Sequence, residues 1–371
     1  MIKRPKRLKK IKKVKDLVPA GVAEKATNLA APKPEEAMSL ENVPQITNET
    51  IAEHREEVLS GSRKYIYPLA HSKRRIIIVT SALLIITIIA FLAYSWVGLY
   101  RFYHYNSFLY RVSQVVPFPI ARVDGDFVNY ENYLFELRRQ VHYYEEQQGD
   151  QANDFSAAED KEQLEQFRKQ SLEKVVNFAY IKELAEANKI SVSGKEANER
   201  IDEVRAQNRL GTDNKVFADV LRDYWGWSIA DFRRSLKDQI LIEKVTAKLD
   251  TEATKKAEAV LAQAKSGADF AGLAKANSGD AASAANGGDY GFAISRSNPN
   301  VPPQVVNVLY KLQPGQVSGI INTGKALEIV KLEKLENDIV TARHIVIPLK
   351  DVKTYIDELK AQKPPKTYVK L

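Results

Sequence analysis

The sequence has 371 residues, of which 44% are hydrophobic and 27% are charged, and its formal net charge at pH 7 is +8. This length allows about two or three domains. The chain has no cysteine, which excludes disulfides, thiol catalysis, cysteine-based zinc sites and a lipid-modified cysteine as an anchor. It has five histidines, and they show no paired ligand spacing: His54, His71, His104, His142 and His344. We therefore expect neither a metalloenzyme nor a bound cofactor.

Residues 1–75 hold much of the positive excess, because nine Lys or Arg fall among the first 15 residues. The segment lacks sustained apolar periodicity, and such a composition cannot bury enough apolar surface to order itself. We therefore predict a disordered basic tail. Three interpretations stay open for it: a solvated tail, attraction to anionic lipid of the inner leaflet and, as the weakest, contact with ribosomal or other nucleic acid. Because the basic excess is local, no specific nucleic-acid partner is expected for the whole protein.

Residues 76–98 form an apolar run of 23 residues without a charged side chain. About 20 apolar residues in a helix span the hydrocarbon core of a bilayer, so this run predicts a transmembrane helix. Lys73, Arg74 and Arg75 precede it, whereas aromatic residues surround a lone Arg101 after it. Because positive flanks stay in the cytoplasm, we predict a single-pass protein of the cell membrane with a cytoplasmic N-terminus and extracytoplasmic C-terminal domains. An uncleaved signal anchor is favoured over a cleaved signal peptide, since a 75-residue leader and a 23-residue apolar core are too long for the latter.

A juxtamembrane stalk is expected at residues 99–119, followed by a helical domain at residues 120–250. In this domain apolar residues recur at helical spacing, and Ser193 with Glu196 has the spacing of a capping box. The expected helices carry their apolar faces at residues 130–144, 164–184, 197–204, 217–224 and 232–245. The pattern therefore predicts an all-α domain.

Short stretches within this helical domain also carry a resemblance. An extended start, Arg-Val-Asp-Gly-Asp-Phe-Val, precedes a long helix, and a later helix ends in Glu-Ala-Asn-Lys-Ile-Ser-Val-Ser. Further on stand Trp-Gly-Trp-Ser and Phe-Arg-Arg-Ser-Leu-Lys-Asp-Gln-Ile-Leu. In this order the stretches resemble the N-terminal helical domain of the extracytoplasmic foldases SurA and PrsA. The resemblance implies a chaperone module that holds unfolded chains.

From residue 251 the pattern changes to short helices that alternate with strand-like segments, which predicts a small α+β domain over residues 251–349. Its motifs are Phe-Ala-Gly-Leu-Ala-Lys from residue 270, Ser-Gly-Asp-Ala-Ala-Ser-Ala from residue 278, Gly-Gly-Asp-Tyr-Gly from residue 287, and Leu-Gln-Pro-Gly-Gln-Val-Ser from residue 312. Their order and spacing resemble those of the parvulin-type peptidyl-prolyl isomerases, the PpiC rotamases. The predicted fold class is α+β: a transmembrane helix, an all-α chaperone-like domain and a small parvulin-like domain.

An isomerase of this kind lowers the barrier of about 18–20 kcal/mol to rotation about an amide bond. No covalent step is needed, because an apolar pocket grips the proline ring and fixed dipoles favour the twisted amide. The resemblance implies that Asp280 takes the catalytic position of the family's Asp or Cys. It also implies that Glu328 stands where the family has its C-terminal His. The alternative for Asp280 is a loop carboxylate that accepts backbone N–H bonds.

The resemblance also implies a set of substrate-binding residues. Tyr290 falls on the pocket Leu, Val301 and Val305 fall near the pocket Met and Phe, and Phe292 joins the set. Two valines in place of larger side chains, and Glu328 in place of His, depart from the family pattern. An inactive isomerase domain is therefore the alternative to an active one.

The first strand of a parvulin, Ala-x-His-Ile-Leu, is missing at the start of this domain, and its match, Ala-Arg-His-Ile-Val from residue 342, follows the last strand. We predict that residues 341–348 insert as the central strand of the sheet, with residues 333–340 as a connector. This arrangement is a circularly permuted parvulin, with His344 beside Asp280 as a further catalytic residue. The alternatives are a second, truncated isomerase domain and a loose C-terminal extension.

These features together predict a membrane-anchored extracytoplasmic foldase that binds unfolded or nascent secreted or surface polypeptides and their X-Pro segments. Residues 350–371 are expected to form a C-terminal helix and a tail. One alternative is a non-catalytic chaperone. Another is a structural or adaptor membrane protein with a degenerate rotamase domain, whose basic tail docks a cytoplasmic partner.

Overall fold

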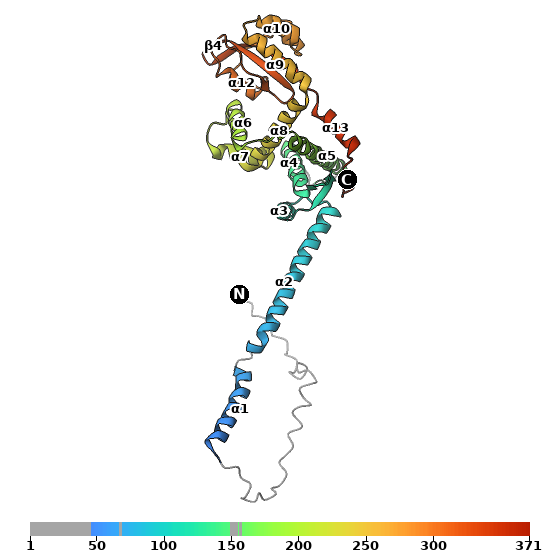
Figure 1. The fold of residues 1–371 in the computed structure, drawn as a ribbon, viewed down its shortest axis with the longest axis vertical. Helices are drawn as coiled ribbons and strands as arrows, with labels where there is room; N and C mark the ends of the chain where they lie inside the picture. Colours follow the sequence, from blue (N-terminus) through green and yellow to red (C-terminus); the bar gives the residue numbers. More distant parts are fainter. Residues whose placement is uncertain (1–45, 67–68, 149–154, 156–157) are drawn as a thin grey trace, which may run out of the picture. The chain divides into compact units, whose positions relative to one another are not determined.

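The computed structural model describes residues 46–66, 69–148, 155 and 158–371 (Figure 1). It divides into two units, Met1–Leu84 and Ile85–Leu371. Helix α2 (Leu69–Tyr100) contributes residues to both units. The second unit contains helices and two small antiparallel sheets. The predicted α+β class is therefore confirmed.

Helix α1 (Asn48–Ile66) lies inside the segment predicted to be disordered, so that prediction is wrong for these residues. Four of its 19 residues are Glu and two are Arg, and both residue types favour a helix even without packing. At its start the Thr50 hydroxyl donates to the Thr47 carbonyl at 2.9 Å, and the Thr47 N–H donates to the Thr50 hydroxyl at 3.0 Å. Residues 1–45, with most of the basic tail, lie outside the described residues, as do the side chains of residues 63–75.

Helix α2 contains an apolar stretch of 25 residues, Ile76–Tyr100, that is long and apolar enough to cross a membrane. The predicted span, residues 76–98, lies inside this stretch. Its most apolar window is 0% buried. The apolar side chains of this window are therefore exposed and do not form the core of a soluble domain.

Residues 99–119 do not form a separate stalk, so this expectation is wrong. Helix α3 (Ser107–Val115) lies in this range and buries Leu109 and Val112. Leu99 is fully buried, and the Tyr100 hydroxyl donates to the Pro119 carbonyl at 2.6 Å. Burying a large apolar side chain contributes about 1.5–3 kcal/mol, so these residues are more stable inside the folded unit than in a solvated linker.

Five helices make up most of the predicted all-α region: α4 (Tyr130–Gln148), α5 (Ala158–Ala187), α6 (Gly194–Gln207), α7 (Asn214–Trp225) and α8 (Ile229–Leu249). The predicted capping box of Ser193 and Glu196 begins α6. Gly226 ends α7 in the left-handed conformation, with φ 65°. The buried aromatic side chains of Tyr130, Tyr133 and Tyr180 join the core that α4 and α5 share.

A small sheet precedes α4 and is completed by the other end of the chain. Strand β1 (Pro119–Val123) pairs with β2 (Asp126–Asn129) on one side and with β6 (Lys366–Thr367) on the other. Between β5 and β6 lies the expected C-terminal helix, α13 (Val352–Gln362), which packs alongside α5 (Figure 1). After β6, Val369 is buried in the same core as α4 and α5. The C-terminal tail is therefore part of the first sheet and its core.

The parvulin-like region is built around the second sheet, whose strand order is β3-β4-β5. Its elements are α9 (Thr251–Lys265), α10 (Phe270–Asn277), α11 (Ala281–Ala284), α12 (Pro303–Leu309), β3 (Ile321–Asn322), β4 (Ala326–Glu336) and β5 (Ile339–Pro348). Helices α9 and α10 pack with Ile345 and Ile347 on one face, and α12 packs with Val340 and Ala342 on the other. Successive side chains of a strand point to opposite faces, so His344 shares the face of α12.

Strands β4 and β5 form one long hairpin, so residues 333–340 are not the connector that we predicted. The ladder runs from the pair Ala326 and Pro348 to the pair Glu336 and Ile339. The turn residues Asn337 and Asp338 have φ 52° and 59°. Two left-handed residues are what a type I′ hairpin turn requires, and Asn and Asp tolerate this conformation well.

Candidate active site

Strand β5 carries His344 and is hydrogen-bonded along both edges. One edge pairs with β4, where His344 stands opposite Val330. On the other edge the His344 N–H donates to the Gly288 carbonyl at 2.8 Å, and Val340 and Ile294 exchange two backbone hydrogen bonds of 2.9 Å. Strand β5 therefore joins the sheet, but in the order β3-β4-β5 it is an outer strand and β4 is the central one, so the predicted central position is wrong. Isolated bridges from Asp289 to Arg343 and from Ile294 to Val340 connect its other edge to the chain around residues 288–294.

Gly288 allows the chain to approach β5 this closely. Its φ is +78°, and a Cβ atom at this position would lie 2.2 Å from the His344 carbonyl oxygen. A side chain is therefore excluded by both the backbone conformation and the space. The Arg343 guanidinium also holds this chain segment, because it donates to the carbonyls of Asn286 and Gly287 at 2.8 and 3.1 Å.

Three polar side chains meet at this edge of the sheet. Asp280 stands at the start of α11, and the Ser283 hydroxyl donates to its Oδ2 atom at 2.5 Å. The Nε2 atom of His344 lies 2.8 Å from the Ser283 oxygen and 3.2 Å from Asp280 Oδ2. Because Ser283 uses its only proton on Asp280, its oxygen accepts from His344, which places a proton on Nε2. The predicted proximity of His344 and Asp280 is confirmed.

The environment of Asp280 favours the ionised carboxylate. The Ser283 hydrogen bond is the largest cause and lowers the pKa of Asp280 below its ordinary value; burial opposes it as the second cause, and His344 adds a smaller lowering. The side chain keeps 36% of its surface exposed. An anionic acceptor therefore stands at the edge of the site, within reach of a ligand.

Glu328 and Tyr290 close the inner side of the site. A Glu328 oxygen lies 3.5 Å from His344 Nδ1, and the ring centroids of Tyr290 and His344 are 3.9 Å apart. Burial, reinforced by the negative charge of Glu328, raises the pKa of Tyr290 well above its ordinary value, so its phenol stays protonated. Neither His344 Nδ1 nor the Tyr290 hydroxyl makes a hydrogen bond of full geometry. Both atoms are buried, and the charged group beside them is the Glu328 carboxylate.

The predicted substrate-binding residues do not form one pocket. Val301 and Val305 have exposed fractions of 1% and 0% and lie in the core around α12, so the structure does not present them to a substrate. A valine is too short to reach from this core to the surface. Phe292 is 43% exposed and packs edge-on against Tyr290 at 5.7 Å. Tyr290 and Phe292 are therefore the aromatic surface that borders the polar site.

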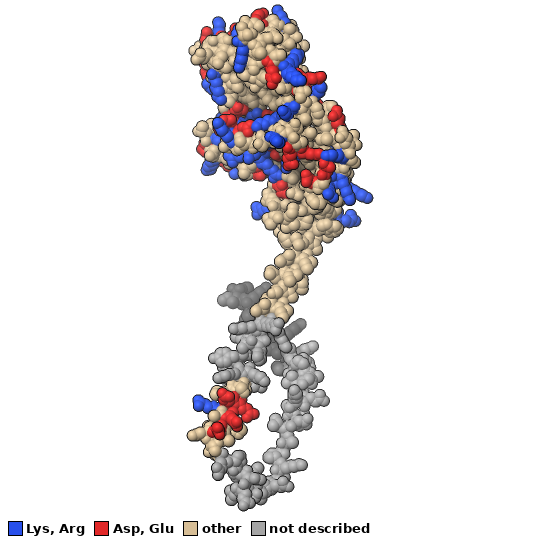
Figure 2. Space-filling view, viewed as in Figure 1, with Lys and Arg blue, Asp and Glu red and all other residues tan. Residues whose placement is uncertain are grey.

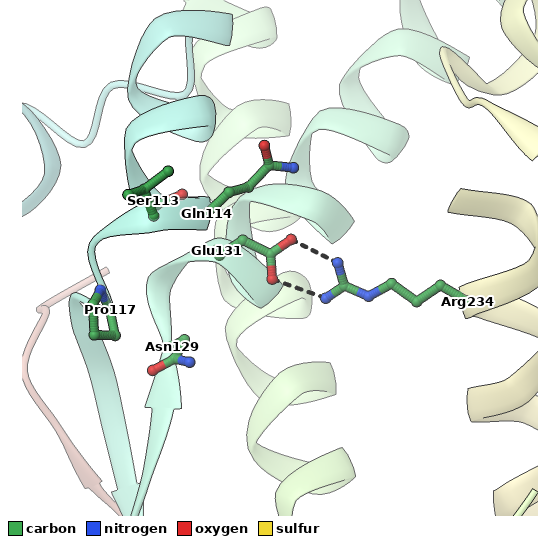
Figure 3. A pocket seen from close by; sticks show the side chains of 7 residues that line it. Ser113, Gln114, Pro117, Asn129, Glu131 and Arg234 are labelled. Atoms are coloured by element: carbon green, nitrogen blue, oxygen red, sulfur yellow. Dashed lines mark hydrogen bonds and ion pairs between the residues drawn. The ribbon is translucent and has the colours of Figure 1, made fainter. Parts of the chain in front are cut away.

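A cavity of 430 Å³ lies elsewhere, between α3, α4 and α8. Figure 3 shows the carboxylate of Glu131 and the guanidinium of Arg234 facing each other at this cavity, with N–O distances of 2.6 and 3.0 Å. Arg234 also donates to the Asn132 side chain at 2.6 Å and covers the Phe135 ring. Because this guanidinium is already paired, we assign it a structural role that joins α4 to α8.

Two residues of the site were missed by the sequence analysis. Ser283 bridges Asp280 and His344, and Arg343 fixes the loop beside β5. The signal for Ser283 was its position three residues after Asp280, the spacing of one helical turn. No comparable signal existed for Arg343, because the carbonyls to which it donates and the carboxylate of Asp289 lie more than 50 positions away in the sequence, and Glu333 faces it only across the hairpin.

Comparison with known proteins agrees with this architecture. Residues 70–246 match the family model of the SurA-like N-terminal domain, and residues 239–334 match that of the PPIC-type PPIASE domain. The chain thus combines a SurA-like N-terminal domain with a PPIC-type rotamase domain. The rotamase match ends at residue 334 and so does not include β5 with His344. The whole of β5 therefore lies outside the residues that match the rotamase family model.

Individual relatives match over short parts of their length. Chaperone SurA of Burkholderia orbicola is 51% identical over 81 residues, which are 22% of this chain and 17% of the relative. Chaperone SurA of Methylobacillus flagellatus is 32% identical over 145 residues, covering 35% of this chain and 32% of the relative. Periplasmic chaperone PpiD of Escherichia coli is 36% identical over 88 residues, covering 24% and 14%. The chain thus spans less than a third of each of these relatives.

One solved structure also aligns with the chain, the peptidylprolyl isomerase PrsA from Bacillus anthracis. The alignment covers 52% of this chain and 88% of PrsA at 20% identity, with a TM-score of 0.17. A TM-score this low does not allow the two folds to be compared.

Proposed function

We propose that this protein is a single-pass, membrane-anchored extracytoplasmic foldase. Helix α2 supplies an apolar span of 25 residues, and basic residues precede this span. The relative PpiD is named a periplasmic chaperone. Positive flanks stay in the cytoplasm, so the second unit faces the outside of the cell membrane. Contact of the basic tail with anionic lipid belongs to the same proposal.

The helical region binds unfolded or nascent polypeptides in this proposal. Its match to the SurA-like domain and the chaperone names of its relatives support this role. Its surface also carries partly exposed aromatic rings: Tyr143 stacks on Trp225 at 5.2 Å, and Trp227 stacks on the buried ring of Phe135 at 5.1 Å. Partly exposed aromatic side chains provide large contact areas for apolar segments of an unfolded chain.

The parvulin-like region isomerises X-Pro bonds in this proposal. The main support is that the side chains of Asp280, Ser283 and His344 lie together, next to the rings of Tyr290 and Phe292. The aromatic pair is positioned to contact the proline ring. The hydrogen-bonded side chains of Asp280, Ser283 and His344 supply the fixed dipoles that stabilise the twisted amide, which has lost its resonance. Catalysis then needs only preorganised polar groups that bind the twisted amide more strongly than the planar one.

Peptide binding without catalysis is the second candidate. It is favoured by the burial of Val301 and Val305, which leaves the proline ring with a shallow aromatic contact only. Glu328 favours it as well, because a carboxylate near the site opposes the electron-rich amide. In that case the region binds X-Pro segments and adds affinity to the chaperone.

A prolyl isomerase assay on the full chain in detergent separates these candidates. Asp280→Asn and His344→Gln are compared with Asp357→Asn, an exposed carboxylate on α13. Isomerase activity predicts a rate above background that falls about 10-fold or more in the first two variants and is unchanged in the third. A rate equal to background in the unmodified chain rejects isomerisation and leaves the binding role.

The chaperone role has its own test, independent of the isomerase site. The full chain is mixed with an unfolded model protein and light scattering is followed. A foldase suppresses aggregation at near-stoichiometric amounts, also with Asp280→Asn. An adaptor protein leaves the scattering unchanged, and this result rejects the chaperone proposal.

Topology is tested by adding protease to spheroplasts. Degradation of the chain beyond residue 100, with the N-terminal tail spared, supports the proposed orientation. Protection of the second unit contradicts it.

A further inference from the structure

Helix α3 has two opposite faces. Leu109 and Val112 are buried, whereas Phe108 and Val115 keep 49% and 84% of their surfaces exposed. Phe108 and Val115 are seven residues apart and therefore lie on the same face of the helix, with the exposed Arg111 between them. The exposed face of this short helix is thus apolar with one positive charge.

The contacts of Phe108 with α2 indicate how deep the exposed face of α3 lies in the membrane. Its ring lies 5.9 Å from the ring of Phe91 and 6.2 Å from that of Tyr94. Both partners belong to the apolar stretch Ile76–Tyr100. A helix needs about 20 residues to cross the hydrocarbon core, and counting from Ile76 the twentieth residue is Ser95. Phe91 and Tyr94 therefore stand inside the outer edge of the hydrocarbon, and Phe108 stands beside them.

The end of α2 is fixed to the folded unit, so this depth does not depend on a flexible linker. The Tyr130 hydroxyl donates to the Leu99 carbonyl at 2.6 Å, and the His104 N–H donates to the Gly98 carbonyl at 2.9 Å. A Cβ atom on Gly98 would lie 3.0 Å from a methyl group of Leu109, which shows how closely α3 approaches α2. The part of α2 from Ile85 onward and the helix that carries Phe108 therefore belong to one unit.

We propose that α3 is an interfacial helix that lies in the outer leaflet, with Phe108 and Val115 against acyl chains and Arg111 against lipid phosphates. The proposal rests on the membrane anchoring proposed above. Amphipathic helices of this kind bury their apolar face about 5–10 Å into the boundary between headgroups and acyl chains. Figure 2 shows an uncharged surface around the C-terminal part of α2 and the adjoining folded unit, with Lys and Arg at its sides. The exposed Trp96 fits the aromatic belt at this level.

The contacts of Phe108 favour lipid, and not an unfolded polypeptide, as the partner of the exposed face of α3. Phe108 is held against side chains of the membrane span, where a client from the aqueous phase would first have to enter the bilayer. The interfacial helix would also orient the folded unit on the membrane, since one spanning helix alone leaves rotation and tilt free.

The absence of native cysteine allows a direct test on the full chain. Val115→Cys, Phe108→Cys, Val216→Cys and Leu84→Cys are each labelled with an environment-sensitive fluorophore and reconstituted into vesicles of phosphatidylcholine and phosphatidylglycerol. Val216, on α7, is a matched exposed valine, and Leu84 reports the middle of the span. Lipid-borne and aqueous quenchers are then compared.

The proposal predicts that labels at positions 108 and 115 are quenched several-fold more by the lipid-borne quencher than the label at 216, and less than the label at 84. Equal quenching at 115 and 216, with strong lipid quenching at 84, overturns the interfacial helix and leaves the anchor standing. Exposure of the label at 84 to the aqueous quencher overturns the anchor itself. Because Val115 makes few contacts, its variant is expected to retain the far-ultraviolet circular dichroism of the unmodified chain.

Discussion

The two small sheets of this protein are both completed by the C-terminal part of the chain, but to very different extents. In the sheet β3-β4-β5, the C-terminal strand β5 pairs with β4 over its whole length and contributes buried side chains to both faces. In the sheet β2-β1-β6, only two residues of β6 pair with β1, and Val369 alone adds a fully apolar buried side chain. Strand β5 is thus part of the core of the parvulin-like region, whereas β6 only holds the C-terminal tail against the first sheet.

The comparison shows what determines how much a C-terminal strand contributes to the free energy of unfolding of the sheet that it joins. Backbone pairing by itself contributes little, because the unfolded chain makes the same hydrogen bonds with water. The larger contribution comes from burial of apolar side chains, which stabilises the fold by about 1.5–3 kcal/mol for each large aliphatic side chain. Strand β5 buries Val340, Ile345 and Ile347 and positions His344. We therefore expect the parvulin-like region to depend on β5 far more than the helical region depends on β6.

The largest expected effect comes from ending the chain after Asn337. This change removes β5, exposes one edge of β4 and uncovers the apolar residues of α9 and α10. Several buried aliphatic side chains are lost, so the destabilisation exceeds about 5 kcal/mol, of the order of the whole stability of a small domain. Thermal unfolding should lose the transition of the parvulin-like region.

A chain that ends after Leu349 is the control for this truncation, because it keeps β5 and removes only α13 and β6. Its parvulin-like region should unfold cooperatively. If the chain ending after Asn337 melts in the same way as this control, β5 is a loose extension.

Gly288→Ala is expected to have the next largest effect, about 3 kcal/mol or more. The new methyl group meets the His344 carbonyl at 2.2 Å in a left-handed backbone conformation, which costs about 1–2 kcal/mol even without the clash. Denaturant unfolding measures the loss. Gly291→Ala is the matched control, since Gly291 has a similar φ of +74° but open space around it. Equal losses in both variants would show that the approach to β5 is not the cause.

Ending the chain after Gln362 removes β6 and tests the first sheet. We expect the helical region to lose about 2–3 kcal/mol of its free energy of unfolding. The change removes buried Val369 and the Lys363 carbonyl, which accepts from the Tyr180 hydroxyl at 2.6 Å. The helical region should melt several degrees lower, whereas the parvulin-like region should keep its stability. A loss of the same size in both regions contradicts the separate roles of the two sheets.

Tyr290→Phe has the smallest expected effect and depends on pH. The folded state raises the pKa of Tyr290, so its contribution to stability is complete below the ordinary value near 10 and is lost as the pH rises above it. At pH 7 the variant and the unmodified chain should have nearly equal stability. At pH 11 the variant should be more stable by about 1 kcal/mol. A difference that does not change between pH 8 and 11 argues against a buried phenol at this position.

Much of the fold could be predicted from local patterns. Helical spacing and caps gave most of the helical region, because Ser193 and Gly226 act on neighbours a few residues away. The placement of His344 could be predicted as well, since a sheet without its first strand leaves unpaired backbone groups. The I′ turn at Asn337 and Asp338 was overlooked, although such pairs favour tight hairpins.

The remaining features depend on contacts between distant segments. Residues 99–119 have the aromatic composition of a membrane interface, yet their packing against α4 decides that they fold. Val301 and Val305 match pocket positions by spacing, but spacing does not show that their short side chains lie in the core. The role of Ser283 became visible only once β5 brought His344 to it.

The central claim is that residues 339–348 are an integral strand that brings His344 to Asp280. Hydrogen exchange of the intact chain tests it most directly, because the amides of Val340 and His344 donate to Ile294 and Gly288 and not to β4. We predict that peptides covering 339–348 exchange as slowly as those covering β4, within about tenfold, as expected for one cooperative unit. Rapid exchange over 339–348 beside a protected β4 would contradict the account.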